Sequence, residues 1–169
     1  PEPAAEPEPE SVSDEPGYDA EIAAIFTEES AELLESTDKA LLEWTGNKGS
    51  SQPMEELKRH LHTLKGGARM AELTPVGDLT HNLESLVVLV SEGKVKTDKK
   101  LFDLLQESVD ILTNLLGEVK QRKPLSPVGD INRRIEMMMR GEIEEKRSVE
   151  RFYVDLQQLE TEEGEDVED

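Results

Sequence analysis

Apolar residues recur at intervals of three, four and seven along most of this chain, which is the spacing of one face of a helix. Nowhere do they alternate with period two for long enough to predict a strand. The pattern predicts four long helices, over about residues 19–44, 53–71, 74–93 and 98–120. We therefore expect an all-α fold, built as an antiparallel four-helix bundle.

Residues that begin or stop helices mark the ends of these segments. Gly46 and the loop after it close the first helix, and Pro53 fits the first turn of the second. Thr74 and Pro75 are typical of the N-cap and first residue of the third helix. In the first helix the expected core positions are Ile22, Ile25, Phe26, Leu33, Leu34, Leu41 and Trp44.

Two helical additions follow the four main helices. Ser126 and Pro127 begin a fifth, shorter helix that we expect to stop at Gly141. Residues 142–160 have helical charge pairs and only a thin apolar stripe. This stripe fits two arrangements equally well: it docks on the bundle, or it forms a marginal helix that leads into a linker.

The charge of the chain is concentrated at its two ends. The formal net charge is −20, yet residues 1–19 hold seven acidic residues and residues 155–169 hold eight, with no Lys or Arg in either range. We expect a disordered Pro/Glu-rich linker over 1–17, a helical domain over 18–140, and a charged helical segment over 141–169 that runs into an acidic disordered linker. Nucleic acids and anionic membranes are bound by clustered Lys and Arg, so neither is an expected partner.

The chain has no cysteine, which excludes disulfides and thiolate metal sites and fits a reducing compartment. No apolar run approaches the roughly 20 residues needed to span a bilayer. We expect a cytoplasmic protein. Because the chain begins with Pro1 rather than Met, we also expect it to be a segment of something longer.

The stretch HTLKGGARMAEL, residues 62–73, departs from an ordinary amphipathic helix. Two adjacent glycines, Gly66 and Gly67, each cost about 1 kcal/mol relative to alanine in a helix interior. On a helical wheel Lys58, His62, Lys65 and Arg69 form a stripe beside the leucine face. Such a stripe needs an explanation other than packing.

A matching stripe of Gly77, His81 and Glu84 lies on the next predicted helix. If the two helices turn near residue 73, residues whose numbers sum to about 146 become neighbours. His62 then lies beside Glu84, and Lys65 lies beside His81. Two independent helical patterns thus bring four functional groups to one patch.

The chemistry that suits this patch is phosphoryl carriage on imidazole. A carboxylate that accepts a hydrogen bond from Nδ1–H of His62 selects the tautomer in which Nε2 keeps its lone pair. Lys65 would offer positive charge to phosphoryl oxygens. Gly66 and Gly67 would leave an edge without side chains, over which a partner protein can approach His62.

Two motifs resemble those of histidine-containing phosphotransfer (HPt) domains. His62 to Gly66 matches their H-x-L-K-G signature, and Thr80 to Glu84 matches the T-H-x-x-E segment of the HPt domain that begins chemotaxis histidine kinases. The resemblance covers about residues 18–140. The acidic, Pro-rich flanks resemble spacers between the repeated HPt domains of large kinases that govern type IV pilus motility.

The resemblance implies a role for each residue of the patch. His62 would accept the phosphoryl group, Glu84 would activate it by a hydrogen bond to Nδ1, and Lys65 and His81 would support transfer. We expect the partner-docking residues to be Lys58, Gly66, Gly67 and Arg69.

The implied partners are a histidine kinase catalytic domain and a response-regulator receiver domain. We predict no bound cofactor or metal in this segment, because ATP and Mg²⁺ would be used by the kinase domain. Whether the chain is itself an enzyme stays open: the segment is a phosphocarrier, and we expect it to be part of a histidine kinase polypeptide. We expect the domain itself to be a monomer.

Some features depart from the family pattern and leave alternatives open. Arg69 and Glu72 stand where many members have a small residue and glycine, so Arg69 would assist phosphate binding, select the partner, or be a solvated charge. A second hypothesis is a scaffold of the same fold that docks receivers without using His62. A third, a carboxylate-histidine metal bundle, needs Glu-x-x-His pairs, and the sequence has none.

Overall fold

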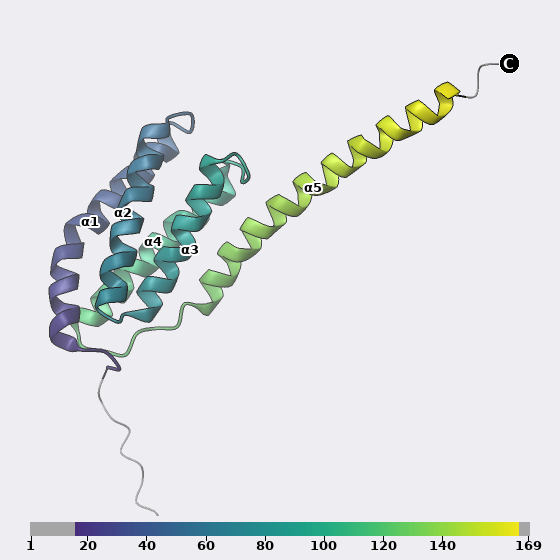
Figure 1. Cartoon of the computed structure of the whole chain (residues 1–169). Coiled ribbons are helices and arrows are strands. Elements are labelled where there is room, and N and C mark those ends of the chain that lie inside the picture. The colour runs from purple at the N-terminus through teal and green to yellow at the C-terminus, as the bar shows by residue number, and fades with distance from the viewer. Residues whose placement is uncertain (1–15, 166–169) are drawn as a thin grey trace, which may run out of the picture.

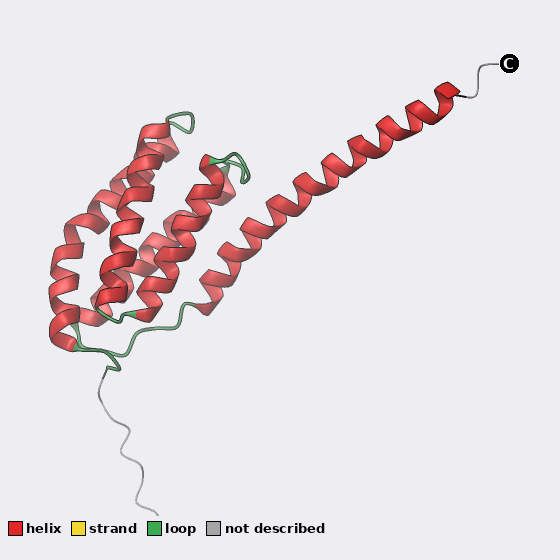
Figure 2. Cartoon of the chain, in the orientation of Figure 1, coloured by secondary structure: helices red, strands yellow, loops and turns green. Residues whose placement is uncertain are grey.

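The computed structural model describes the backbone of residues 16–165 and the side chains of residues 16–141 and 148–159. The described part consists of five helices and contains no strand (Figure 2). The helices are α1 (Ala20–Gly46), α2 (Ser51–Met70), α3 (Thr74–Ser91), α4 (Lys99–Lys120) and α5 (Gly129–Glu165). The expected linker over residues 1–17 lies almost entirely outside the described residues, as do residues 166–169 at the other end.

The first four helices close into a bundle. Helix α1 packs on α2, α2 on α3, α3 on α4, and α4 back on α1, while α5 packs on α3 (Figure 1). The buried side chains form one hydrophobic cluster to which all five helices or their caps contribute. The predicted all-α bundle with a fifth helix is confirmed.

Polar residues cap the start of two helices. The Asp19 side chain accepts hydrogen bonds from the backbone N–H groups of Glu21 and Ile22, and Asp98 accepts one from Leu101. These bonds satisfy N–H groups that have no partner within the helix. At α3 the N-cap is Leu73 rather than the predicted Thr74, which lies one residue inside the helix with Pro75 after it.

The core face of α1 differs from the prediction at its N-terminal end. Ile22 and Ile25 are half exposed, at 50% and 60%, and the predicted core role of both is wrong. Ala23, Phe26 and Thr27 face the core there instead. Thr27 can be buried because its hydroxyl donates to the carbonyl of Ala23 at 2.8 Å, which satisfies its polar group.

The two adjacent glycines of α2 lie in different surroundings. Gly66 is exposed, and a Cβ built on it would meet nothing within 4 Å. A Cβ on Gly67 would lie 2.7 Å from the ring of Phe26 on α1, a side chain that is only 7% exposed. Gly67 therefore allows α1 and α2 to approach closely, and its predicted role as an open approach surface is wrong. Only Gly66 leaves that edge bare.

This difference predicts opposite effects of the same substitution at neighbouring positions. Gly66→Ala is expected to stabilise the protein by about 1 kcal/mol, because alanine is the better helix former. Gly67→Ala brings the same gain in helix propensity, but its new Cβ is too close to the Phe26 ring, at a cost of about 1–3 kcal/mol in stability. Urea unfolding should therefore show Gly67→Ala less stable than Gly66→Ala by that cost. Equal stability of the two variants would show that the contact with Phe26 relaxes without cost.

Helix α5 does not stop where the sequence predicted. It continues through Gly141 to Glu165 and runs away from the bundle (Figure 1). Its side chains over residues 148–159 are exposed, so this segment is helical but not docked on the bundle. A glycine costs a helix only about 1 kcal/mol, and strong helix formers on both sides of Gly141 offset that cost. Residues 161–165, which we expected to be disordered, belong to the same helix.

Among the helices that the structure describes, none has an apolar stretch of the length that a bilayer requires.

Candidate functional site

His62 and Glu84 meet across the interface between α2 and α3. The two helices are joined by a short turn, so they run antiparallel with residues of complementary number side by side. His62 Nδ1 lies 2.9 Å from Glu84 Oε1. The His62 side chain is 69% exposed, whereas that of Glu84 is 17% exposed. The predicted contact between these two residues is present.

Lys65 holds the other oxygen of the same carboxylate. Its Nζ lies 2.6 Å from Glu84 Oε2, and its side chain is only 15% exposed. The sequence predicted that Lys65 lies beside His81 and offers positive charge to the phosphoryl oxygens. In the structure the lysine ammonium is instead committed to Glu84, so its first effect is to fix the carboxylate that faces His62.

The ionisation of Glu84 follows from these contacts. Burial is the largest single influence and by itself raises the pKa of the carboxyl. Hydrogen bonds and charge from Lys65 and His62 together outweigh burial, so the pKa of Glu84 lies below its ordinary value. Glu84 is therefore an anion at neutral pH, as a hydrogen-bond acceptor for the imidazole must be.

The exposed edge of His62 is its Nε2 side. With a proton on Nδ1 donated to Glu84, the neutral imidazole keeps the Nε2 lone pair free for attack. The anionic partner also stabilises positive charge that develops on the ring when Nε2 forms a new bond. The arrangement therefore suits a nucleophilic imidazole that reacts with a group brought to it from outside the bundle.

The other predicted site residues lie at increasing distance from His62. His81 is exposed and lines a shallow hollow together with Lys65 and Glu84, so the structure places it in the patch. Lys58, one turn before His62, pairs with Glu55 on its own helix at 2.9 Å.

Arg69 lies at the C-terminal end of α2, next to its last residue. It is seven residues from His62, a rise of about 10 Å along the helix. Its Cγ lies 3.5 Å from the position of a Cβ on Gly77, and it lines a separate hollow at the turn between α2 and α3. The structure does not bring Arg69 to His62.

Two supporting features were not foreseen from the sequence. Thr80 is fully buried, and its hydroxyl donates to the carbonyl of Val76 at 2.7 Å, which lets a polar residue sit beneath the site. Gly77 is buried on α3, and a Cβ on it would be in ordinary contact with Arg69 and Ala68 of α2. Both residues belong to the predicted stripe and motif, but only the neighbouring helix shows what each one contacts.

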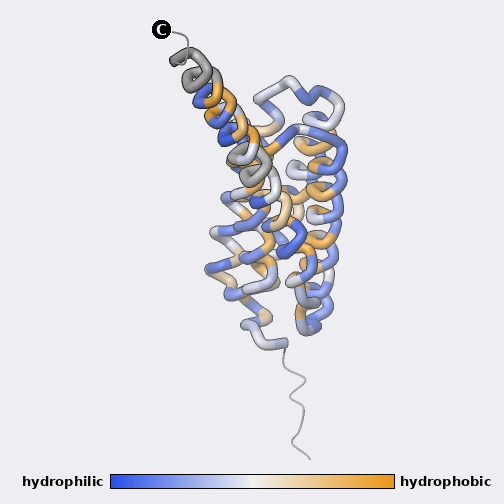
Figure 3. The backbone as a smooth tube through the Cα atoms, turned by 90° about the vertical axis from the view of Figure 1, so that its right-hand side faces the viewer, coloured by the Kyte–Doolittle hydropathy of each residue, from blue (hydrophilic) through white to orange (hydrophobic). Residues whose placement is uncertain are grey.

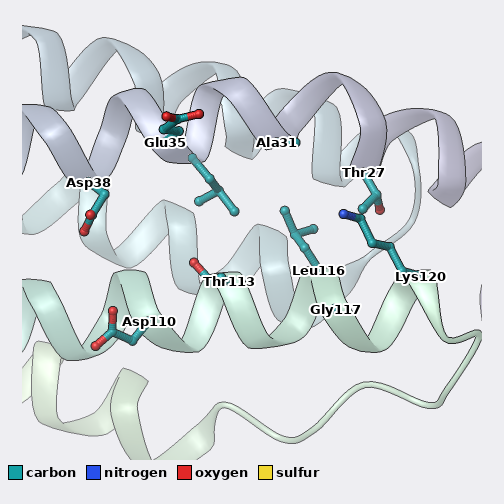
Figure 4. A pocket seen from close by; sticks show the side chains of 10 residues that line it. Thr27, Ala31, Glu35, Asp38, Asp110, Thr113, Leu116, Gly117 and Lys120 are labelled. Atoms are coloured by element: carbon teal, nitrogen blue, oxygen red, sulfur yellow. The ribbon is translucent and has the colours of Figure 1, made fainter.

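A groove on the opposite side of the bundle is not part of this site. It runs between α1 and α4, as Figure 4 shows, with Asp38 and Asp110 near one end and Lys120 near the other. Gln106 donates hydrogen bonds to both aspartates, so they are partnered within the fold. The groove contains no histidine, and α2 and α3 lie across the bundle from it. Among the side chains that the structure describes, those of residues 16–141 and 148–159, no cluster of three His, Asp or Glu residues could hold a metal ion.

The ion pair between Lys65 and Glu84, which we call the lysine clamp, predicts how Glu84 titrates. In Lys65→Met the pKa of Glu84 is expected to rise relative to the unsubstituted protein, because burial remains while the main opposing contact is lost. Carbon-13 NMR of the Glu84 carboxyl during a pH titration measures this shift. Lys58→Met is the matched control, since Lys58 pairs with Glu55, and should leave the Glu84 titration unchanged.

The sign of the stability change follows from the same lowered pKa. The Lys65–Glu84 pair contributes fully to the free energy of unfolding above the ordinary carboxyl pKa of about 4.3. This contribution is lost as the pH falls through the lower pKa that Glu84 has in the folded state. An unchanged Glu84 midpoint in Lys65→Met would contradict the clamp.

Known proteins with similar sequences were identified by comparison. The chain is 24% identical over 133 residues to the chemotaxis protein CheA of Borreliella burgdorferi, covering 78% of this chain and 15% of that protein. It is 29% identical to CheA of Halobacterium salinarum, covering 73% and 17%, and 33% identical to a gliding motility regulatory protein of Myxococcus xanthus, covering 62% and 13%. The chain thus spans less than a fifth of the length of each of these curated relatives.

A solved structure has the same fold. It is the crystal structure of the phosphorylated P1 domain of CheA3 in complex with CheY6 from R. sphaeroides, which aligns with a TM-score of 0.61 at 24% identity and covers 75% of this chain and 98% of that one. The family model described as Hpt domain matches residues 21–121, which includes α1 to α4 and the whole His62–Glu84–Lys65 site. This chain belongs to the Hpt domain family.

Proposed function

We propose that this chain is a phosphocarrier, in which His62 accepts a phosphoryl group from the ATP-binding domain of a histidine kinase and passes it to an aspartate of a receiver domain. The observation that carries the proposal is the exposed His62 ring, held through Nδ1 by a buried carboxylate that is itself held by Lys65. A histidine arranged in this way is oriented and activated but has no partner on its outer nitrogen. That nitrogen is open to reagents presented by other proteins.

The chemistry uses few groups of this chain. Nε2 attacks the γ-phosphorus of ATP held by the kinase domain, the N–P bond forms, and ADP leaves with the electrons of the broken P–O bond. Glu84 stabilises the ring while it carries positive charge, because the Nδ1 proton stays between them. In the second step the receiver aspartate attacks phosphorus, the N–P bond breaks, and neutral His62 is restored. Mg²⁺ and ATP are used by the partners.

Exposed apolar side chains about two helical turns from His62, toward the C-terminal end of α2, support a protein partner. Met70 on α2 is 84% exposed, and Ile22 and Ile25 on α1 are half exposed. Gly67 lies against Phe26, where α2 and α1 run antiparallel. Met70 is about one turn after Gly67 on α2, and Ile22 is about one turn before Phe26 on α1, so Met70 and Ile22 lie at nearly the same level. Gly66, one turn from His62, leaves the part of this edge nearest the histidine without a side chain, and the apolar area lies about two turns from His62. We propose it, rather than Gly67, as the docking edge.

The names of the relatives support a motility pathway. Two are chemotaxis proteins and one is a gliding motility regulatory protein. We propose that the parent polypeptide is a cytoplasmic histidine kinase of chemotaxis type. The acidic, Pro-rich N-terminal flank and the acidic C-terminal flank support the proposal that it is one of those that control type IV pilus motility. In this setting the chain is one carrier domain within a larger transferase.

The test is a two-step transfer experiment. The chain is incubated with a chemotaxis-type kinase catalytic domain and γ-labelled ATP, separated, and then mixed with a receiver domain. We expect label on the chain that is stable in base and lost in acid, as for a phosphoramidate, followed by movement of the label to the receiver. A chain that binds the receiver but never becomes labelled by any cognate kinase would instead be a silent docking scaffold.

A further inference from the structure

The outer half of α5 carries an apolar face that is exposed among the described residues. Val149, Phe152, Leu156 and Leu159 follow each other at intervals of three, four and three, and each is between 41% and 62% exposed. Figure 1 shows this half of the helix running away from the bundle, and Figure 3 shows hydrophobic residues interspersed with hydrophilic ones along it. We call these four residues the outer seam.

The outer seam is in heptad phase with the face of α5 that the bundle covers. Val128, Ile131 and Ile135 are buried in the core and Met138 packs against it, again at intervals of three, four and three. Seven-residue steps lead from Ile135 through Glu142 to Val149, and from Met138 through Glu145 to Phe152. One helix thus carries two apolar seams separated by two glutamates, and only the inner seam has a partner.

We propose that the outer seam binds the outer seam of a second copy of this chain, with the two helices antiparallel. The repeat of apolar residues at a and d positions is the pattern that two helices bury against each other. A helix as short as the outer seam would be marginal alone, but here the packed first half of α5 has already nucleated it. The pair therefore does not bear the full cost of forming a helix.

The charges beside the seam favour the antiparallel orientation. If Val149 lies opposite Leu159 of the second copy, Lys146 and Glu160 both occupy the heptad position that follows d, and residues at this position pair along one side of an antiparallel seam, twice by symmetry. The two Tyr153 side chains meet at the centre, and one Asp155–Asp155 contact is unfavourable. A parallel pair would instead set Asp155 beside Glu160 on both sides, with no compensating Lys–Glu contact.

The same sequence limits the extent of the pair. Glu145 and Glu163 occupy the next seam positions before and after the outer seam, and they would be level with each other in the antiparallel pair. Two acidic positions at the same level are unfavourable in an apolar seam, so the apolar contact is limited to the residues between them. Only about three turns of helix take part, and we expect a weak complex with a dissociation constant on the order of 100 μM. The antiparallel orientation sends the two bundles to opposite ends. The bundle itself can therefore remain the monomeric domain that the sequence led us to expect.

Sedimentation equilibrium of the whole chain tests the pairing. From roughly 10 μM to 1 mM the average mass is expected to rise from one chain toward two. Phe152→Glu, in the middle of the seam, should stay a single chain over that range. Val154→Glu is the matched control, because Val154 is also exposed but lies on the outer side of the proposed pair, and it should associate as the unsubstituted chain does.

Introduced cysteines test the orientation, since the chain has none of its own. Under mild oxidation, a mixture of Val149→Cys and Leu159→Cys chains should give a crosslinked pair, whereas each variant alone should give several-fold less. Efficient crosslinking of each variant with itself would show a parallel pair and overturn the antiparallel proposal. A single-chain mass at all concentrations, or equal association of Phe152→Glu and the unsubstituted chain, would overturn the pairing itself. Far-UV circular dichroism confirms that each variant keeps its helix.

Discussion

Replacing His62 by glutamine is expected to abolish phosphorylation of this chain by a chemotaxis-type kinase domain. Glutamine approximates the size of imidazole and can still donate a hydrogen bond from its amide NH₂ to Glu84, but it has no nitrogen lone pair that can attack phosphorus. His62 projects from the bundle with an exposed side chain, so the substitution should leave the fold intact. The measurement is incorporation of label from γ-labelled ATP, with circular dichroism as the check on folding.

The other two histidines of the chain provide matched controls. His60 is half buried, burial lowers its pKa, and no carboxylate hydrogen bond orients it. His81 is exposed in the same hollow as Glu84 but is not the ring that contacts the carboxylate. His60→Gln and His81→Gln should both still become labelled, with a slower rate acceptable for His81→Gln. Full labelling of His62→Gln, or loss of labelling in His60→Gln, would contradict the assignment.

Replacing Glu84 by glutamine is expected to slow phosphorylation of His62 by about 10- to 100-fold without unfolding the chain. The glutamine carbonyl can accept the Nδ1 proton, so the ring orientation is partly retained. The negative charge that supports the ring during attack is lost, and Lys65 loses its partner. The initial rate of labelling at saturating kinase and ATP measures the effect.

Glu92→Gln is the control for this substitution. Glu92 lines the same hollow, but its ion pair is with Lys94 at 2.9 Å and it does not contact His62. Its labelling rate should equal that of the unsubstituted chain. If Glu84→Gln were also labelled at the full rate, Glu84 would be a structural partner of Lys65 with no part in the transfer.

Much of the site could be predicted because it depends on helix register alone. The turn near Leu73 sets which residues of α2 and α3 are level, and the contact between His62 and Glu84 follows from that register. The target of Lys65 was missed because its side chain reaches a full turn, past the residue that is level with it, to the buried carboxylate of Glu84. Register predicts which backbones are neighbours, but long side chains choose among several partners.

The side-chain packing between one helix and the next was harder to predict from the sequence. Nothing in the spacing of α2 shows that Phe26 of α1 will lie on Gly67, because a helical wheel describes only one helix. Ile22 and Ile25 are exposed because Ala23, Phe26 and Thr27 are the residues of α1 that face the core at this level. Helix α5 passes Gly141 because a glycine is a stop signal only where the next residues form a helix poorly, and Glu142 to Lys146 are good helix formers.

The most direct test of the account is to identify the nitrogen of His62 that carries phosphorus. The chain, labelled with nitrogen-15 on histidine and phosphorylated by a cognate kinase domain, can be studied by nitrogen–phosphorus coupling in NMR. Because Nδ1 is held by Glu84 at 2.9 Å, the account predicts coupling at Nε2 of His62 and at no other histidine nitrogen. Phosphorus on Nδ1 of His62, or on His60 or His81, would contradict it.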